Sequence, residues 1–383
     1  MTVEQTLAEL VAIDSVSARS NAEIVLYLQK RCEALGFKIQ RFPHVDEHGI
    51  EKINLVAQTS LCDSQIAGSQ TEVCAPELAL VGHTDTVPYD QNWKEALTLT
   101  ERESKLFGRG ACDTKAFIAA ALTAVESIDI AKLRKPLALV FTADEEIGCL
   151  GAKRLADAKP FTARHAIVGE PTSLQPMRAG KGYCLAHVTV HGREAHSAYP
   201  QIGASAIFRA AKLIEKIEAI AEDVKSDAHT GFDPPYTTLN IGLINGGSAK
   251  NVIPGECRFT LEWRTIPGQP ADFVLNLVRA AVSELEKVDL EFACEIEADR
   301  ADDSFETPTG SDLVKFLEQA SGKAPGTVAF GTEAPSMIAL GAQAVVFGPG
   351  NIRVAHRTGE FVPVDELARC VGILRAAIAH FCL

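Results

Sequence analysis

The sequence predicts an α/β protein in which a ferredoxin-like module is inserted into a larger domain. Its 383 residues exceed the size that one hydrophobic core usually organises, so two domains are expected. Short strands that are apolar throughout alternate with helices in the first half of the chain, as in a sheet covered on both faces. From about Gly180 the order becomes β-α-β-β-α-β, and after Asp302 the first style returns.

The first 180 residues contain most of the signals for the larger domain. Residues 1–15 place glutamates within an apolar helical pattern, without the basic start of a signal peptide. The next helix is expected to begin at a capping box of Ser20 and Glu23 and to end at Gly36. Its buried face is formed by Val25, Leu28, Cys32 and Leu35. Strands are expected at residues 37–43, 54–57, 78–82, 137–142 and 166–169.

The inserted module and the end of the chain supply the remaining elements. Strands of the module are expected at 183–190, 237–244, 257–263 and 290–296, and its helices at 204–223 and 271–286. Strands at 328–330 and 345–347 and a helix at 364–381 complete the larger domain. We therefore predict a catalytic domain at 1–179 and 299–383 and an insert at 180–298. Residues 60–76, rich in Ser, Gln, Gly and Cys, are expected to form an exposed loop.

Composition limits the possible partners. The formal net charge of −13 repels nucleic-acid phosphates and anionic membranes, so a small molecule is the expected partner. Apolar runs are far shorter than the roughly 20 residues that a membrane span requires. Ten cysteines occur without a C-x-x-C pair, which indicates reduced core residues, not disulfides or a zinc knuckle. Together these features predict a soluble cytoplasmic protein.

A histidine and an aspartate follow the expected strand at 78–82. Residues two apart on an extended segment share a face, so Asp85 can receive one imidazole N–H of His83 while the other nitrogen binds a metal. An isolated H-x-D pattern is more often a satisfied turn histidine. This pattern alone therefore leaves both interpretations open.

Further acidic residues follow other strand-like segments. Asp113 precedes an Ala-rich helix, where an N-cap role is the alternative. Glu145 and Glu146 follow one buried strand, and Glu170 follows another. Strand ends line the ligand crevice of open α/β sheets, so these acids can converge, although their repulsion is costly without cations. Two divalent ions resolve the conflict, with one of the paired glutamates binding metal and the other facing a water.

Four stretches of the chain, taken in order, resemble the motifs of the M20 metallopeptidase family of co-catalytic zinc enzymes. They are residues 82–88, 108–115, 142–146 and 169–172. The resemblance covers essentially the whole chain. It implies a zinc-peptidase-like catalytic domain with a mixed central sheet flanked by helices, interrupted by a lid and dimerisation domain, and hence a homodimer. The family usually has Met and Gly around Lys115, whereas this chain has Thr114 and Ala116.

The resemblance also implies a ligand set for two divalent metal ions, zinc or alternatively cobalt. By that resemblance His83 and Glu170 belong to one metal, Glu146 and His356 to the other, and Asp113 bridges both. His356 lies in a loop after an apolar strand, and spacing alone does not distinguish it from the other nine histidines.

The same resemblance implies the catalytic groups. Glu145 is the expected general base, Asp85 the residue that orients His83, and His196 of the insert the group that stabilises the developing oxyanion. The alternative for His196 is a capping or turn residue before the next helix. Because the insert pairs two chains in this family, His196 is expected to act in the active site of the partner subunit.

The T-E-A-P segment at 332–335 resembles the deacetylase branch of the family, as do Lys181, Asn251 and Arg264. The implied reaction is removal of the acetyl group from N-acetyl-L-ornithine, a step of arginine biosynthesis. Arg264 and Lys181 would pair with the substrate α-carboxylate, and Glu333 would favour a cationic side chain. As alternatives, Arg264 closes a salt bridge in the lid and Glu333 caps the following helix. Another deacylase, a desuccinylase, a carboxypeptidase and an inactive binding protein on the same scaffold remain alternative functions.

Overall fold

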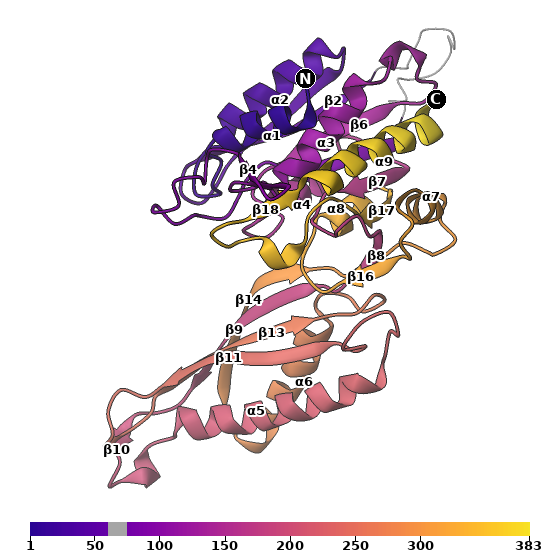
Figure 1. Ribbon diagram of the computed structural model, residues 1–383. Helices are drawn as coiled ribbons and strands as arrows, with labels where there is room; N and C mark the ends of the chain where they lie inside the picture. Colours follow the sequence, from indigo (N-terminus) through magenta and orange to yellow (C-terminus); the bar gives the residue numbers. More distant parts are fainter. Residues whose placement is uncertain (60–74) are drawn as a thin grey trace. The chain divides into compact units, whose positions relative to one another are not determined.

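Figure 1 shows the computed structural model, which describes residues 1–59 and 75–383. The loop expected at 60–76 lies almost entirely outside these described residues. The described chain forms two compact units. Unit 1 comprises Met1–Arg178, Glu306–Gly326 and Thr332–Leu383, and unit 2 comprises Ala179–Phe305 and Thr327–Gly331.

A mixed central sheet underlies unit 1, which confirms the predicted fold class. In sheet order its strands are β1 (Lys38–Val45), β2 (Glu51–Gln58), β6 (Leu137–Thr142), β3 (Leu78–His83), β7 (His165–Val168), β17 (Gln343–Val346), β8 (Met177–Gly180) and β15 (Phe305–Glu306), with β16 (Gly326–Val328) beside β8. The pairs β3–β6, β3–β7 and β7–β17 are parallel. In contrast, β1–β2 and β2–β6 are antiparallel. The predicted strand at 328–330 is thus two residues later than the observed β16.

Helices cover both faces of this sheet. The first set comprises α1 (Val3–Ala12), α2 (Ala22–Ala34), α3 (Lys115–Glu126), α7 (Asp312–Ser321) and α9 (Val364–Cys382). Its apolar residues share one core with alternate strand side chains such as Leu78 and Leu80. The second set, α4 (Leu150–Ala158) and α8 (Ala334–Ala339), contacts β2, β7 and β17. Because Ala79 and Val81 are also buried and side chains alternate along a strand, the two sets lie on opposite faces.

The start of α2 differs from the predicted capping box. The helix begins after Asn21, so Glu23 is its second residue and not its third, and Asn21 makes no capping hydrogen bond. The Ser20 hydroxyl instead accepts a hydrogen bond within the turn. Asn21 does not cap because its side-chain oxygen accepts a hydrogen bond from the Ile53 N–H at 2.9 Å, while its NH2 group donates to the Ile53 carbonyl and the Thr84 hydroxyl, at 2.9 Å each. Tertiary contacts have therefore replaced the local cap.

A small sheet that the sequence patterns did not predict joins distant parts of unit 1. It consists of β4 (Thr100–Arg102), β5 (Lys105–Phe107) and β18 (Phe361–Pro363). Each strand has three residues, which is too short to show a periodic pattern. The pairing of β5 with β18 continues into a hydrogen bond from the Gly108 N–H to the Glu360 carbonyl, at 3.1 Å. Residues just before β18 therefore lie beside the loop that leads to Asp113.

Unit 2 has the predicted ferredoxin-like order. Its antiparallel sheet runs β11 (Thr238–Gly246), β13 (Glu256–Arg264), β9 (Tyr183–His191) and β14 (Ala293–Asp302). The helices α5 (Ala206–Asp223) and α6 (Phe273–Val288) share a core with this sheet. A separate pair joins β10 (Ala195–His196) to β12 (Val252–Ile253). Short 3-10 helices occur at Ile130–Lys132, Pro200–Ile202, Val224–Ser226 and Ile352–Val354. Among residues 1–59 and 75–383, no helix is long and apolar enough to cross a membrane.

Candidate metal centre

The candidate metal ligands of unit 1 gather at one edge of the central sheet. Because β3 is parallel to β6 and β7, these three strands end at the same edge. His83 is the last residue of β3, Glu145 and Glu146 follow β6, and Glu170 follows β7. Asp113 comes just before α3, whose N-cap residue is Thr114, so the N-cap alternative for Asp113 is wrong.

Asp113 lies between two histidines. Its Oδ1 is 3.0 Å from His83 Nε2, and its Oδ2 is 3.1 Å from His356 Nε2. His356 Nε2 is also 2.9 Å from Glu146 Oε2. One carboxylate therefore presents a different oxygen to each imidazole, which is the arrangement that a ligand bridging two metal ions requires.

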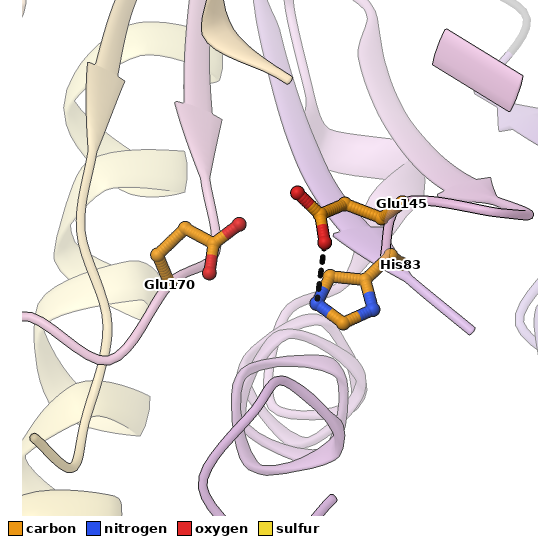
Figure 2. Close-up of side chains that lie close together, drawn as sticks. All are labelled: His83, Glu145 and Glu170. Atoms are coloured by element: carbon orange, nitrogen blue, oxygen red, sulfur yellow. Dashed lines mark ion pairs between the residues drawn. The ribbon is translucent and has the colours of Figure 1, made fainter. Parts of the chain in front are cut away.

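Two further glutamates approach His83 from other segments. Figure 2 shows Glu145 and Glu170 directed toward the imidazole, with Glu145 Oε2 3.9 Å from His83 Nε2. Potential ligand atoms of His83, Glu145 and Glu170 lie within 4.8 Å of one another, as do those of His83, Asp113 and Glu146. Both Glu145 and Glu170 are thus within reach of the same ion.

Asp85 organises the backbone of the acidic loop. His83 Nδ1 lies 3.0 Å from the backbone oxygen of Asp85, whereas the nearer carboxylate oxygen is 3.6 Å away. That carboxylate accepts hydrogen bonds from the N–H groups of Glu145 and Glu146, at 3.1 and 3.3 Å, and from the Ser17 hydroxyl at 2.7 Å. Asp85 therefore contacts His83 mainly through its main chain, and its side chain holds the neighbouring loop.

Burial and neighbouring charges shift the pKa values of the residues in this cluster in opposite directions. Burial alone would raise the pKa of Asp113, but hydrogen bonds with His356 and His83 lower this pKa below its usual range. Hydrogen bonds with Asp113 and Glu146 raise the pKa of His356 to about 10. Burial raises the pKa of Glu145 to about 8, against the opposing charge of His83. The cluster thus holds more buried acid than its two imidazoles can neutralise.

Divalent cations fit this donor set. Carboxylate oxygens and imidazole nitrogens are the ligands that zinc takes in catalytic sites. Glu146 Oε1 is buried and has no hydrogen-bond partner among the described residues. A buried anionic oxygen without a partner is unfavourable, and a bound cation removes that cost.

Glu333 joins the cluster from a distant part of the chain. It occupies the position before α8 but makes no side-chain capping hydrogen bond, so the helix-cap alternative is wrong. Only 1% of Glu333 is exposed. Burial raises its pKa to about 7, while His83 and the Thr142 hydroxyl lower it. The charge of Glu333 therefore interacts with that of His83.

Unit 2 brings two of the predicted residues together on a short pair of strands. His196 pairs with Val252 across β10 and β12, and the Ser197 N–H donates to the Asn251 carbonyl at 3.0 Å. The His196 side chain is exposed and accepts a hydrogen bond at Nδ1 from the Ala198 N–H, at 3.1 Å. This local contact agrees with the alternative in which His196 is a turn residue.

The charged groups of Lys181 and Arg264 both bind other residues of unit 2. The buried Lys181 ammonium donates to the carbonyls of Pro234 and Tyr236, at 2.9 and 2.6 Å. Arg264 donates to the Ala329 carbonyl and pairs with Glu262 at 2.9 Å. The salt bridge considered as an alternative for Arg264 is therefore present.

A buried ion pair that sequence reasoning missed supports Asp113. Glu360 Oε1 accepts hydrogen bonds from the N–H groups of Cys112 and Asp113, at 2.9 and 3.0 Å, and Glu360 Oε2 pairs with Arg109. Arg109 lies in a motif that the sequence singled out, but its partner is 251 residues away. Only the pairing of β5 with β18 brings the two together, so no local pattern could have indicated Glu360.

Comparison with known proteins gives consistent matches. The model of the family described as peptidase family M20/M25/M40 matches residues 79–380. An acetylornithine deacetylase of Myxococcus xanthus is 53% identical, over 98% of this chain and 97% of that protein. Another, from Salmonella paratyphi B, is 35% identical over 97% and 96%. The fold resembles a Staphylococcus aureus tripeptidase, with a TM-score of 0.74 at 23% identity over 99% of this chain and 97% of that one. It also resembles a Sulfolobus solfataricus metallo-carboxypeptidase, with a TM-score of 0.71 at 20% identity over 98% of both.

Proposed function

Because this chain belongs to peptidase family M20/M25/M40, a family of metal-dependent hydrolases, we propose that it hydrolyses N-acetyl-L-ornithine to L-ornithine and acetate. The chain covers nearly all of an acetylornithine deacetylase at 53% identity, which supports this substrate and a place in arginine biosynthesis. One observation carries the hydrolytic assignment. It is the cluster in which the buried Asp113 lies between the buried His83 and the half-exposed His356.

The proposed cofactor is a pair of divalent ions, zinc or cobalt. His83 and Glu170 would hold one ion, Glu146 and His356 the other, and Asp113 would bridge them. Bound there, the ions polarise the acyl carbonyl and lower the pKa of a water.

Glu145 is the proposed general base. Burial favours the protonated form of its carboxyl group and raises its pKa, which favours uptake of a proton by the carboxylate. Glu145 accepts a proton from the attacking water and returns it to the departing amine, so that the C–N bond breaks as acetate and free amine form. The Asp85 carboxylate, through the Glu145 N–H, keeps the base in place.

Four further residues are proposed to select the substrate. Glu333, which is buried and interacts electrostatically with His83, would attract the cationic side chain of ornithine. Arg264 and Lys181 would pair with the substrate α-carboxylate, and Asn251 is a further candidate for substrate binding. The ammonium of Lys181 has three donors, of which two already hold carbonyl oxygens, so the third would serve the substrate.

We further propose a homodimer formed through unit 2, in which His196 stabilises the oxyanion in the partner subunit's site. Large apolar side chains are exposed on α5 and the edge strand β11: Phe208 is 74% exposed, Leu243 71% and Ile244 58%. An exposed edge strand with apolar side chains favours pairing with a second copy.

The test is a substrate panel on metal-loaded protein, combined with Glu145→Gln. We expect the highest kcat/KM with acetylornithine, against acetylcitrulline, acetylmethionine and succinyl-diaminopimelate. Glu145→Gln should lower turnover by roughly 10³-fold or more while about two metal ions per chain remain, because the amide removes only the base. Loss of an ion would make Glu145 a ligand. Wild-type protein that binds metal but hydrolyses nothing in the panel would favour the inactive binding protein.

A further inference from the structure

A buried ion pair lies behind the acidic loop of unit 1. Lys52, on β2, and Asp144, the residue before Glu145, are each 1% exposed in their side chains. Lys52 Nζ is 2.9 Å from Asp144 Oδ1. Removing two charges from water costs free energy that their attraction does not always return, so a buried pair is weak evidence for a purely stabilising role. Its other contacts indicate what it does.

The Lys52 ammonium also holds a second loop. It donates to the carbonyl oxygens of Ser17 and Arg19, the latter at 2.9 Å. The Ser17 hydroxyl donates to the Asp85 carboxylate, which in turn accepts the N–H groups of Glu145 and its neighbour. Lys52 is therefore connected to the acidic loop twice, directly through Asp144 and indirectly through Ser17 and Asp85.

Asp144 adopts a backbone conformation that needs such support. Its φ is +55°, in the left-handed region that residues other than glycine rarely occupy. Asn54, two residues after Lys52 and so on the same face of β2, accepts a hydrogen bond from the Ala143 N–H and donates to the Gly151 carbonyl, at 2.9 Å each. Two side chains of β2 thus hold this turn. Asn54 binds residues before and after Asp144, and Lys52 binds Asp144 itself.

Lys52 is the main counter-charge of Asp144. His44 Nε2 is 3.5 Å from the other carboxylate oxygen. Burial and the Arg154 guanidinium lower the pKa of His44, so its imidazole adds little positive charge near pH 7. Removing Lys52 alone would therefore leave a buried carboxylate without a balancing charge.

We propose that Lys52 and Asp144 form a positioning pair, which fixes the turn from which Glu145 and Glu146 project and so sets the geometry of the base and of one metal ligand. The inference rests on the proposed roles of these two glutamates. Because small misplacements of catalytic groups have large effects on rate, loss of the pair should lower kcat even where the protein stays folded.

The test is a double-mutant cycle of Lys52→Met, Asp144→Leu and the double variant. Lys52→Met removes the main counter-charge of Asp144 and should lower Tm by roughly 10 °C. Asp144→Leu should lower Tm by less, because Lys52 keeps the Asp46 carboxylate at 3.9 Å and two carbonyl oxygens. The double variant removes both charges and should recover most of the loss. A pair with only a structural role would regain kcat together with Tm. A positioning pair should regain Tm while kcat stays about 10- to 100-fold below wild type, with KM within about twofold.

A matched control comes from the partly buried pair of Arg31 and Glu126 in the same unit. The variants Arg31→Met, Glu126→Leu and their combination should change Tm without changing kcat. If the Lys52 and Asp144 double variant does not fold, Asp144→Asn carries the test, because it keeps the shape and removes the charge. We expect it to lower kcat at least about tenfold while the circular dichroism spectrum and metal content are retained.

The outcomes separate this inference from the proposed function. Absence of acetylornithine hydrolysis by wild type, or full activity of Glu145→Gln, would overturn the proposed function. If wild type is active and Glu145→Gln is not, a folded double variant with wild-type kcat overturns the positioning role alone. Wild-type kcat in Asp144→Asn would have the same meaning.

Discussion

The candidate metal centre and the His196 region differ in how firmly the chain holds them. His83 is fully buried at the end of β3, between two parallel neighbouring strands, and its nearest side-chain partner is the buried Asp113. His196 lies on the two-residue strand β10 with an exposed side chain. The contrast supports a candidate metal centre that unit 1 itself organises, and it is compatible with the proposal that His196 acts in the site of a partner subunit.

Loss of a metal ligand is expected to give the largest effect. His83→Ala or His356→Ala should lower metal occupancy below two per chain and reduce activity by roughly 10³-fold or more, because the remaining carboxylates cannot hold both ions. Metal analysis of the purified variants checks this. Retention of both ions by either variant would contradict the ligand set and, with it, the idea of a centre built by unit 1.

A substitution in unit 2 should separate activity from metal binding. His196→Ala is expected to reduce kcat by about 10²- to 10³-fold, the usual effect of losing an oxyanion donor. Metal content and Tm should remain near wild type, because the side chain is exposed and makes one described hydrogen bond. A large fall in Tm or in bound metal would show that His196 is part of the fold of its own chain.

Mixing variants tests whether His196 serves the partner subunit. His196→Ala and Glu145→Ala should each be nearly inactive alone. After dissociation and reassociation, random pairing makes about half of the dimers mixed, each with one intact site, so roughly a quarter of wild-type activity should return. No recovery despite verified subunit exchange would make the histidine local to its own chain.

Protons released on metal binding should give a smaller signal, which depends on residues of unit 1 and not of unit 2. The hydrogen bonds to Asp113 and Glu146 raise the pKa of His356 to about 10, so the metal-free imidazole is protonated near pH 7. A metal ion needs the neutral nitrogen, so binding releases this proton and weakens as the pH falls. Calorimetric titration in two buffers of different ionisation enthalpy measures the release. We expect His196→Ala to behave as wild type and His356→Ala to release fewer protons. Equal heats in both buffers would contradict the proposed protonation.

The sequence predicted the parts of the molecule that depend on local pattern. Apolar strands gave the sheet class, and the β-α-β-β-α-β order gave the topology of unit 2, because both follow from hydrophobic periodicity. Carboxylates after successive strands indicated that the acids would converge. The capping box at Ser20 was wrong, because a tertiary contact of Asn21 replaced it.

Features that depend on distant pairing could not be predicted in this way. Glu360 forms an ion pair with Arg109 because two three-residue strands, β5 and β18, pair with each other. In the sequence Lys52 is a single charged residue in a strand and gives no sign of burial, yet it forms a buried ion pair with Asp144. The preference of Asp85 for main-chain contact with His83 also depends on turn geometry that no residue spacing encodes. The ligand roles and the role of His196 stay predictions.

The proposal that Asp113 bridges two metal ions can be tested most directly by a crystal structure of the zinc-loaded protein, with anomalous diffraction measured at the zinc edge. We expect two zinc peaks roughly 3.5 to 4 Å apart in unit 1. Asp113 should contact both, His83 and Glu170 one, and Glu146 and His356 the other. A single peak, or two peaks without Asp113 between them, would contradict a centre in which Asp113 bridges two ions.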